Sequence, residues 1–269
     1  MRQFTPRDYQ RAAIAHMLET PRCALHAGTG TGKTVSTLTA LDALILAGEC
    51  HKALVLGPLR VARDTWTDEA AKWAHLRHLR ISRIIGTPAQ RRAALRADAD
   101  IYVTNYEQLP WLAEQLDGEW PFDVVVADES TKLKGVRRRQ GTQRAKALAQ
   151  HAHTSIMRFI ELTGTPASNG LVDLWGQAWF IDAGTRLGRS FSAFETRWFT
   201  KGYDGFSIKP TPNAFDEITE RLGDVCLSIE AKDFMDLSAQ IENNVVVTLP
   251  EKARTLYRER EREMYGELA

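Results

Sequence analysis

Residues 27–34 of the 269-residue chain read AGTGTGKT, a spacing of glycines and a lysine that suits binding of a polyphosphate. Three alternating glycines allow backbone N–H groups to turn inward around an anion, and a helix that starts here adds the positive end of its dipole. Lys33 would neutralise the β- and γ-phosphates of a nucleotide, and Thr34 would ligate Mg²⁺. We therefore predict an ATP site at Gly28, Thr29, Gly30, Thr31, Gly32, Lys33 and Thr34; the alternative is a glycine-rich turn without a ligand.

A pair of carboxylates follows the nearly apolar stretch 122–127, FDVVVA. Such a stretch predicts a buried strand of a parallel sheet, and ligands bind at the carboxyl end of these strands. Asp128 would position Mg²⁺ and Glu129 would position the attacking water. The predicted catalytic residues are thus Lys33, Asp128 and Glu129, although an Asp-Glu pair after a strand is by itself often a solvated loop.

A third segment, LTGTPASNG at 162–170, also follows an expected strand. The hydroxyls of Thr163 and Thr165, on either side of Gly164, could sense the region of the γ-phosphate and couple it to the rest of the protein. The alternative is that Thr165 caps a helix that starts at Pro166.

The elements that must position these residues alternate between strands and helices. Helical spacing is clear over 33–47, where Val35, Leu38, Leu41 and Ile45 share a face. Strands are expected at 23–27, 52–57, 79–85, 100–105, 122–128 and 156–164. This alternation predicts an α/β fold with a parallel central sheet covered by helices on both sides. Trp66 and Trp73, at helical spacing, are interpreted as packing residues.

The composition is that of a globular protein, with 43% hydrophobic and 26% charged residues. The polar N-terminus and the lack of a long apolar run indicate neither a signal peptide nor a membrane span. Three dispersed cysteines fit a reducing compartment, so we expect a cytoplasmic protein, in the host cytoplasm if phage-encoded. No structural metal site is expected.

Four blocks in this order resemble the first motor lobe of superfamily two helicases, in the Swi/Snf-like branch found in phages and bacteria. These blocks are FTPRDYQ, VLGPLRVARDTWTDEAAKW, VTNYEQL and TGTPASNGLVDLWGQ. The resemblance implies a RecA-like P-loop NTPase fold, a three-layer sandwich in which Gln10 reads the adenine. It implies a lobe at 1–186. The alternation of strands and helices breaks down at 187–241, where we expect an irregular, mainly helical insertion. The segment NNVVVTLP at 243–250 predicts a strand and the charged segment after it predicts a helix, so we expect the start of a second RecA-like lobe at 242–269.

The same resemblance implies ATP-driven movement along nucleic acid, with double-stranded DNA favoured over RNA. It nominates six residues that would grip the phosphate backbone without reading sequence: Pro58, Leu59, Arg60, Thr104, Asn105 and Tyr106. A basic run that follows the carboxylates adds Arg137, Arg138 and Arg139, for which a solvated loop is the alternative.

Two departures from the family pattern affect the expected activity. Thr131 stands where the branch usually has His, which places the usual coupling contact in doubt. No Gln-x-x-Gly-Arg-x-x-Arg element occurs in the 269 residues, and this element carries the arginine finger of the second lobe. We expect the chain to bind ATP with Mg²⁺ but to hydrolyse it poorly without a second lobe, supplied in cis or in trans.

Other functions remain open at this point. The chain could be the motor of a restriction or recombination assembly, or a non-catalytic module that binds DNA or a partner protein and uses ATP as a switch. A small-molecule kinase would explain the phosphate loop but not the segment 162–170 or the Swi/Snf-like blocks.

Overall fold

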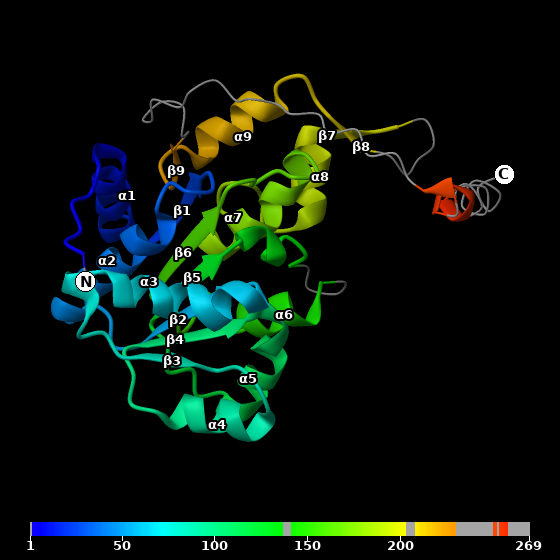
Figure 1. Ribbon diagram of the computed structural model, residues 1–269. Coiled ribbons are helices and arrows are strands. Elements are labelled where there is room, and N and C mark those ends of the chain that lie inside the picture. Colours follow the sequence, from blue (N-terminus) through cyan, green and yellow to red (C-terminus); the bar gives the residue numbers. More distant parts are fainter. Residues whose placement is uncertain (1, 137–140, 203–207, 230–249, 252, 258–269) are drawn as a thin grey trace. The chain divides into compact units, whose positions relative to one another are not determined.

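Seven parallel strands form the central sheet of this computed structural model, which describes residues 2–136, 141–202, 208–229, 250, 251 and 253–257 (Figure 1). In spatial order they are β3 (Ile81–Arg83), β4 (Ile101–Asn105), β2 (Ala53–Gly57), β5 (Val124–Asp128), β6 (Arg158–Thr163), β1 (Arg22–Ala27) and β9 (Cys226–Ile229). All neighbouring pairs run parallel. The six strands predicted from the sequence are present, and the predicted α/β class is confirmed.

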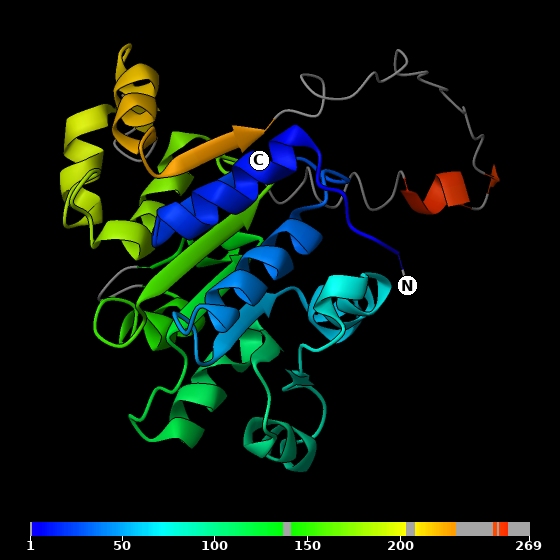
Figure 2. The same cartoon turned by 90° about the vertical axis from the view of Figure 1, so that its left-hand side faces the viewer.

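Helices cover both faces of this sheet (Figure 1, Figure 2). One face carries α1 (Asp8–Glu19), α2 (Lys33–Leu46) and α3 (Trp66–Lys72), and the other carries α5 (Leu109–Leu116), α6 (Gln143–Ala149) and α7 (Leu174–Asp182). The short helix α4 (Pro88–Arg96) follows the edge strand β3. The molecule therefore has the three-layer arrangement that the alternating pattern predicted.

The strands in the middle of the sheet are apolar because helices cover them on both sides. Every residue of β2, β4 and β5 is buried. On the face of α7, Phe159 of β6 stacks on Phe180 with ring centroids 5.3 Å apart. On the opposite face, α2 buries Val35, Leu38 and Leu41, three of the four residues expected to form its apolar side. This packing fixes the ends of the strands, where the predicted site residues lie.

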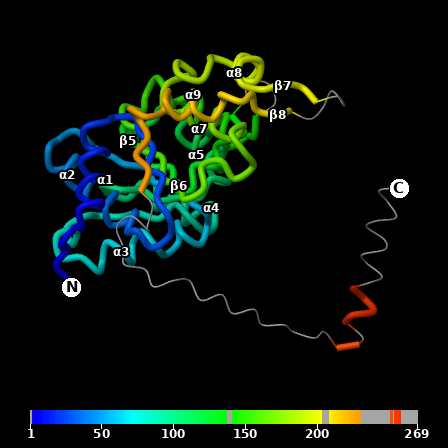
Figure 3. Tube along the Cα trace, turned by 90° about the horizontal axis from the view of Figure 1, so that it is seen from above, coloured from blue at the N-terminus to red at the C-terminus, as the bar shows by residue number. Residues whose placement is uncertain are grey.

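After α7 the chain forms α8 (Phe191–Trp198), the strand pair β7 (Phe199–Lys201) and β8 (Ile208–Pro210), and α9 (Ala214–Leu222). It then returns to the main sheet as β9, which pairs with β1 beside α1 (Figure 3). His16 of α1 forms a hydrogen bond with the carbonyl of Val225, at 3.2 Å. Strand β9 was not predicted, because four residues after an acidic helix carry too little periodicity to identify a strand.

The chain divides into two compact units, Met1–Phe234 and Met235–Ala269. In the second unit, the described residues include a helical turn in which the N–H groups of Ala253 and Arg254 donate to the carbonyl of Pro250. The strand expected at 243–250 lies almost wholly outside the described residues. Among the helices that the structure describes, none combines the length and apolar character needed to cross a membrane.

Candidate nucleotide and nucleic-acid site

The phosphate-loop residues connect the end of β1 at Ala27 to the start of α2 at Lys33. Gly30 and Gly32 have φ angles of +84° and +80°, a left-handed conformation that glycine adopts without strain. A Cβ placed on Gly28 or Gly30 would meet no atom within 4 Å, so the loop has open space beside its backbone. The loop thus has the backbone shape and the room that a polyphosphate requires.

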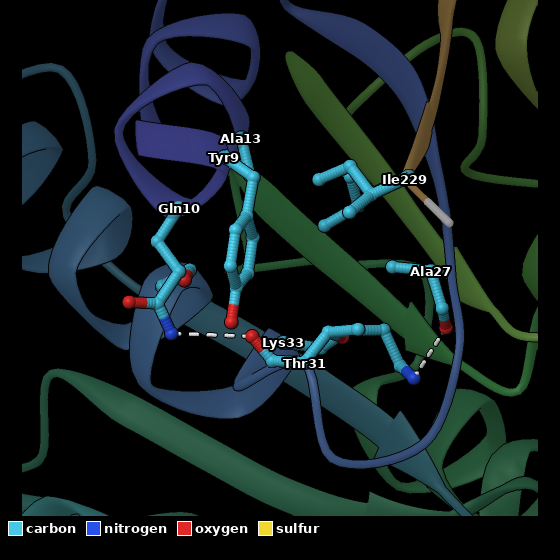
Figure 4. Close-up of a pocket in the computed structure, with 9 residues that line it drawn as sticks. Tyr9, Gln10, Ala13, Ala27, Thr31, Lys33 and Ile229 are labelled. Carbon is cyan, nitrogen blue, oxygen red and sulfur yellow. Dashed lines mark hydrogen bonds between the residues drawn. The ribbon is translucent and has the colours of Figure 1, made fainter. Parts of the chain in front are cut away.

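Lys33 folds back into this loop (Figure 4). Its Nζ donates to the carbonyls of Ala27, at 2.7 Å, and Gly28, at 3.0 Å. Partial burial lowers the pKa of the Lys33 ammonium, and the charges of Asp128 and Glu129 oppose that shift. The ammonium is therefore held at the mouth of the loop, where it can exchange two carbonyls for phosphate oxygens.

Gln10 of α1 is tied to the same loop. Its Nε2 donates to the Thr31 carbonyl at 3.1 Å, and its Oε1 accepts from the Arg7 N–H at 3.0 Å. Figure 4 shows the small pocket around it, lined by Tyr9, Gln10, Ala13, Leu25, Ala27, Thr31, Lys33, Ser36 and Ile229. Two of these residues were not predicted: Tyr9, which is adjacent to Gln10, and Ile229, which the unexpected strand β9 brings here.

Asp128 ends β5 and is buried. Trp66 donates from its indole Nε1 to the Asp128 Oδ2 at 3.3 Å. Burial, together with the charge of Glu129, raises the pKa of Asp128 to about 6, and the charge of Lys33 opposes the rise. Trp66 is fully buried, as predicted, but its role includes a polar contact that helical spacing alone could not indicate.

Glu129 adopts a left-handed backbone conformation, with φ 61° and ψ 57°. For a residue other than glycine this costs on the order of 1–3 kcal/mol, and such strain is concentrated at functional sites. The preceding carbonyl, that of Asp128, accepts a hydrogen bond from the buried Tyr106 hydroxyl at 2.8 Å. The chain is thus held in an unusual turn at the position predicted to orient water.

The predicted coupling residues, Thr163, Gly164 and Thr165, lie between the Asp128–Glu129 turn and the phosphate loop, because β6 separates β5 from β1 in the sheet. A Cβ on Gly164 would be 3.4 Å from the carbonyl oxygen of Ala27, so this loop touches the start of the phosphate loop. Thr163 is buried and its hydroxyl accepts from the Thr165 N–H at 3.1 Å. Lys33, Asp128 and Thr163 therefore lie together at the carboxyl ends of the central strands.

These residues suit a nucleotide with Mg²⁺. The open glycine loop suits phosphate, and a hydroxyl and a buried carboxylate, those of Thr34 and Asp128, are oxygen ligands of the kind that Mg²⁺ prefers. Bound there, Mg²⁺ would supply positive charge to the phosphates. The strong electrostatic contribution of this chain's own residues would come from Lys33 and the loop N–H groups.

The residues predicted to contact nucleic acid differ in exposure. After β2, Pro58 is partly buried while Leu59 and Arg60 are exposed. Thr104, Asn105 and Tyr106 are buried, and the Thr104 hydroxyl donates to the Ile84 carbonyl at 2.8 Å. Contact of these three side chains with phosphate requires this loop to open and stays a prediction. Arg137, Arg138 and Arg139 lie outside the described residues.

A family model of the SNF2-related domain matches residues 9–266. Protein p41 of Acyrthosiphon pisum secondary endosymbiont phage 1 is 48% identical over 274 residues, covering 100% of this chain and 60% of that protein. The DNA excision repair protein ERCC-6-like of Danio rerio is 27% identical over 204 residues, covering 71% of this chain and 13% of its own length. This chain therefore spans only part of these relatives.

Among solved structures, the Sulfolobus solfataricus SWI2/SNF2 ATPase core in complex with dsDNA superposes with a TM-score of 0.69 at 26% identity. The match covers 98% of this chain and 53% of that one. The fold is therefore the RecA-like α/β fold of a SWI2/SNF2 ATPase core. With the family match over nearly its whole length, this chain belongs to the SNF2-related domain family.

Proposed function

We propose that this chain is the Mg-ATP-binding lobe of a DNA-dependent translocase. The observation that carries the proposal is the convergence of Lys33, Asp128 and Thr163 at one edge of the sheet. A small-molecule kinase would need the phosphate loop, but it would not explain the loop 163–165 against Ala27.

In this proposal the phosphate loop and Lys33 bind the polyphosphate, and Gln10 recognises the adenine. Thr34 and Asp128 hold Mg²⁺, while the strained turn at Glu129 directs its carboxylate toward the attacking water. Protonated Asp128 is a poor metal ligand, so its raised pKa makes Mg²⁺ binding weaker as the pH falls through about 6.

The proposed nucleic-acid partner is duplex DNA, gripped through its phosphates. Leu59 and Arg60 support this because they are exposed at the carboxyl end of β2, the same edge as the nucleotide residues. A related ATPase core has been solved in complex with dsDNA, which is consistent with this partner. We extend the proposed contact surface to Arg137, Arg138 and Arg139 on the basis of their charge.

We further propose that these 269 residues turn over ATP slowly by themselves. They contain no Gln-x-x-Gly-Arg-x-x-Arg element, and an arginine that stabilises transition-state charge is worth roughly a thousandfold or more in rate. The same observation favours a second candidate function, a module in which bound ATP switches affinity for DNA or a partner protein without hydrolysis.

The test is ATP turnover by the pure chain, with and without duplex DNA, beside a Lys33→Ala variant. The translocase proposal predicts slow turnover that duplex DNA stimulates and that Lys33→Ala abolishes. Magnesium-dependent ATP binding with no turnover under any condition would favour the switch. Absence of binding in the wild-type chain would reject both.

A further inference from the structure

A set of buried polar contacts joins the segment after Glu129 to the loop 163–166 through α7. Ser130, fully buried, donates from its hydroxyl to the Gln177 Oε1 at 2.8 Å. Gln177, only 4% exposed, donates from its Nε2 to the Pro166 carbonyl at 2.8 Å and to the Asp173 carbonyl at 3.1 Å. The side chain of Gln177 therefore contacts both the segment after Glu129 and the loop 163–166.

The chemistry of this position requires an amide. The oxygen of Gln177 accepts from a hydroxyl while its nitrogen donates to two carbonyls, so both ends of the group are used. A carboxylate would face those carbonyls without a proton to donate, and an aliphatic side chain would leave all three partners unpaired. Buried polar groups that lose their partners are costly, which makes this link specific.

A second contact holds the same two segments together. Lys134 donates from Nζ to the Asp173 Oδ2 at 2.9 Å, and that oxygen also accepts from the Ser168 hydroxyl and the Asn169 N–H. Gly176 adds close packing, because a Cβ there would lie 2.3 Å from the Lys134 carbonyl oxygen. A shift of either segment is therefore passed to the start of α7.

We propose that Gln177 is a positioning residue that couples the Asp128–Glu129 turn to the loop 163–165, so that nucleotide state and DNA affinity are linked through it. The inference rests on the proposed function, because it assigns how the two binding events communicate. In this proposal Gln177 acts indirectly, through Ser130 on one side and Pro166 on the other.

The experiment measures duplex-DNA affinity of the full chain with and without a non-hydrolysable ATP analogue and Mg²⁺. The ratio of the two affinities is the linkage, which for coupled sites is typically about 5- to 150-fold. We expect wild-type linkage of at least about fivefold, and a Gln177→Leu ratio that falls to within about twofold of unity. The affinity of the variant for DNA without the analogue, and for the analogue without DNA, should each stay near the wild-type value.

Two further variants separate coupling from folding. Ser130→Ala breaks one end of the link but keeps Gln177. The double variant Ser130→Ala with Gln177→Leu removes both members of the Ser130–Gln177 pair, so that only the carbonyls of Pro166 and Asp173 lose a donor. Both should lose linkage while melting as folded proteins. Gln115→Leu, at an exposed glutamine of α5, is the matched control and should keep it.

The outcomes are distinct. Wild-type linkage retained in Gln177→Leu or in the folded double variant overturns the inference, as does a wild-type chain that binds both partners without linkage. A wild-type chain that binds neither ATP analogue nor DNA contradicts the proposed function instead.

Discussion

The indole of Trp66 donates to the carboxylate of Asp128 at 3.3 Å, within a buried contact between α3 and the end of β5. The contact orients the carboxylate that we propose as a Mg²⁺ ligand. A π-helical turn at Val61–Thr65 precedes Trp66 and leads the chain from the end of β2 into α3. The packing of Trp66 and the position of the proposed metal ligand are therefore linked.

Trp66→Phe should weaken Mg²⁺-dependent nucleotide binding by about tenfold, because a hydrogen bond to a charged group contributes roughly 1.5–3 kcal/mol. The measurement is a Mg²⁺ titration of fluorescent-nucleotide binding. Trp73→Phe is the matched control, because the indole hydrogen bond that it loses, at 2.9 Å, is to Glu69 of α3 and not to Asp128. Equal Mg²⁺ dependence in the two variants would refute a positioning role for Trp66.

Glu161→Gln should make thermal stability less sensitive to pH. Burial raises the pKa of Glu161 well above its usual 4.5, opposed by Arg22, so its neutral form stabilises the fold below the unfolded-state pKa. That contribution is lost as the pH rises toward the folded-state pKa. The Tm of the variant relative to wild type should therefore increase by about 2 °C or more between about pH 5 and pH 8. The exposed Glu119→Gln should show no such trend.

Gly176→Ala should destabilise the protein by about 1–3 kcal/mol, because the new Cβ would press on backbone that cannot move aside cheaply. The nearest atom, the Lys134 carbonyl oxygen, is 2.3 Å from that position. Chemical denaturation gives the free energy of unfolding. In Gly223→Ala the nearest atom lies at 3.4 Å and φ is −61°, so the control should be close to neutral.

Arg60→Ala should reduce the slope of log affinity against log salt for duplex DNA by about 0.9, the value for one lost phosphate contact. Arg80→Ala should leave the slope unchanged. Arg80 directly precedes β3, so it lies at the amino ends of the strands, and it is paired with Asp98 and Asp100. An unchanged slope for Arg60→Ala would remove this residue from the proposed DNA surface.

The sequence indicated the six main strands and α2 because their apolar periods are strong and bounded by glycines and charges. It also indicated that Lys33, Asp128 and Thr163 follow strands of a parallel sheet, and the carboxyl ends of such strands lie on the same side of the sheet. Contacts between segments far apart in the sequence could not be predicted from it. Trp66 with Asp128, Ser130 with Gln177 and Ile229 beside Tyr9 depend on packing that no local period encodes.

The burial of Thr104 and Tyr106 was equally hidden. A threonine and a tyrosine at a strand end suit surface contact as well as interior bonding, and only the three-dimensional neighbours, Ile84 and Asp128, distinguish these roles. The burial of these two side chains therefore became known only from the structure.

The most direct test of the central claim is binding of fluorescent ATP to the wild-type chain and to Lys33→Ala, each with Mg²⁺ and with a chelator. We expect saturable binding by the wild-type chain that Mg²⁺ strengthens, and a large loss of that binding in the folded variant. Equal binding by the two proteins would contradict the assignment of the loop 27–34 as the nucleotide site.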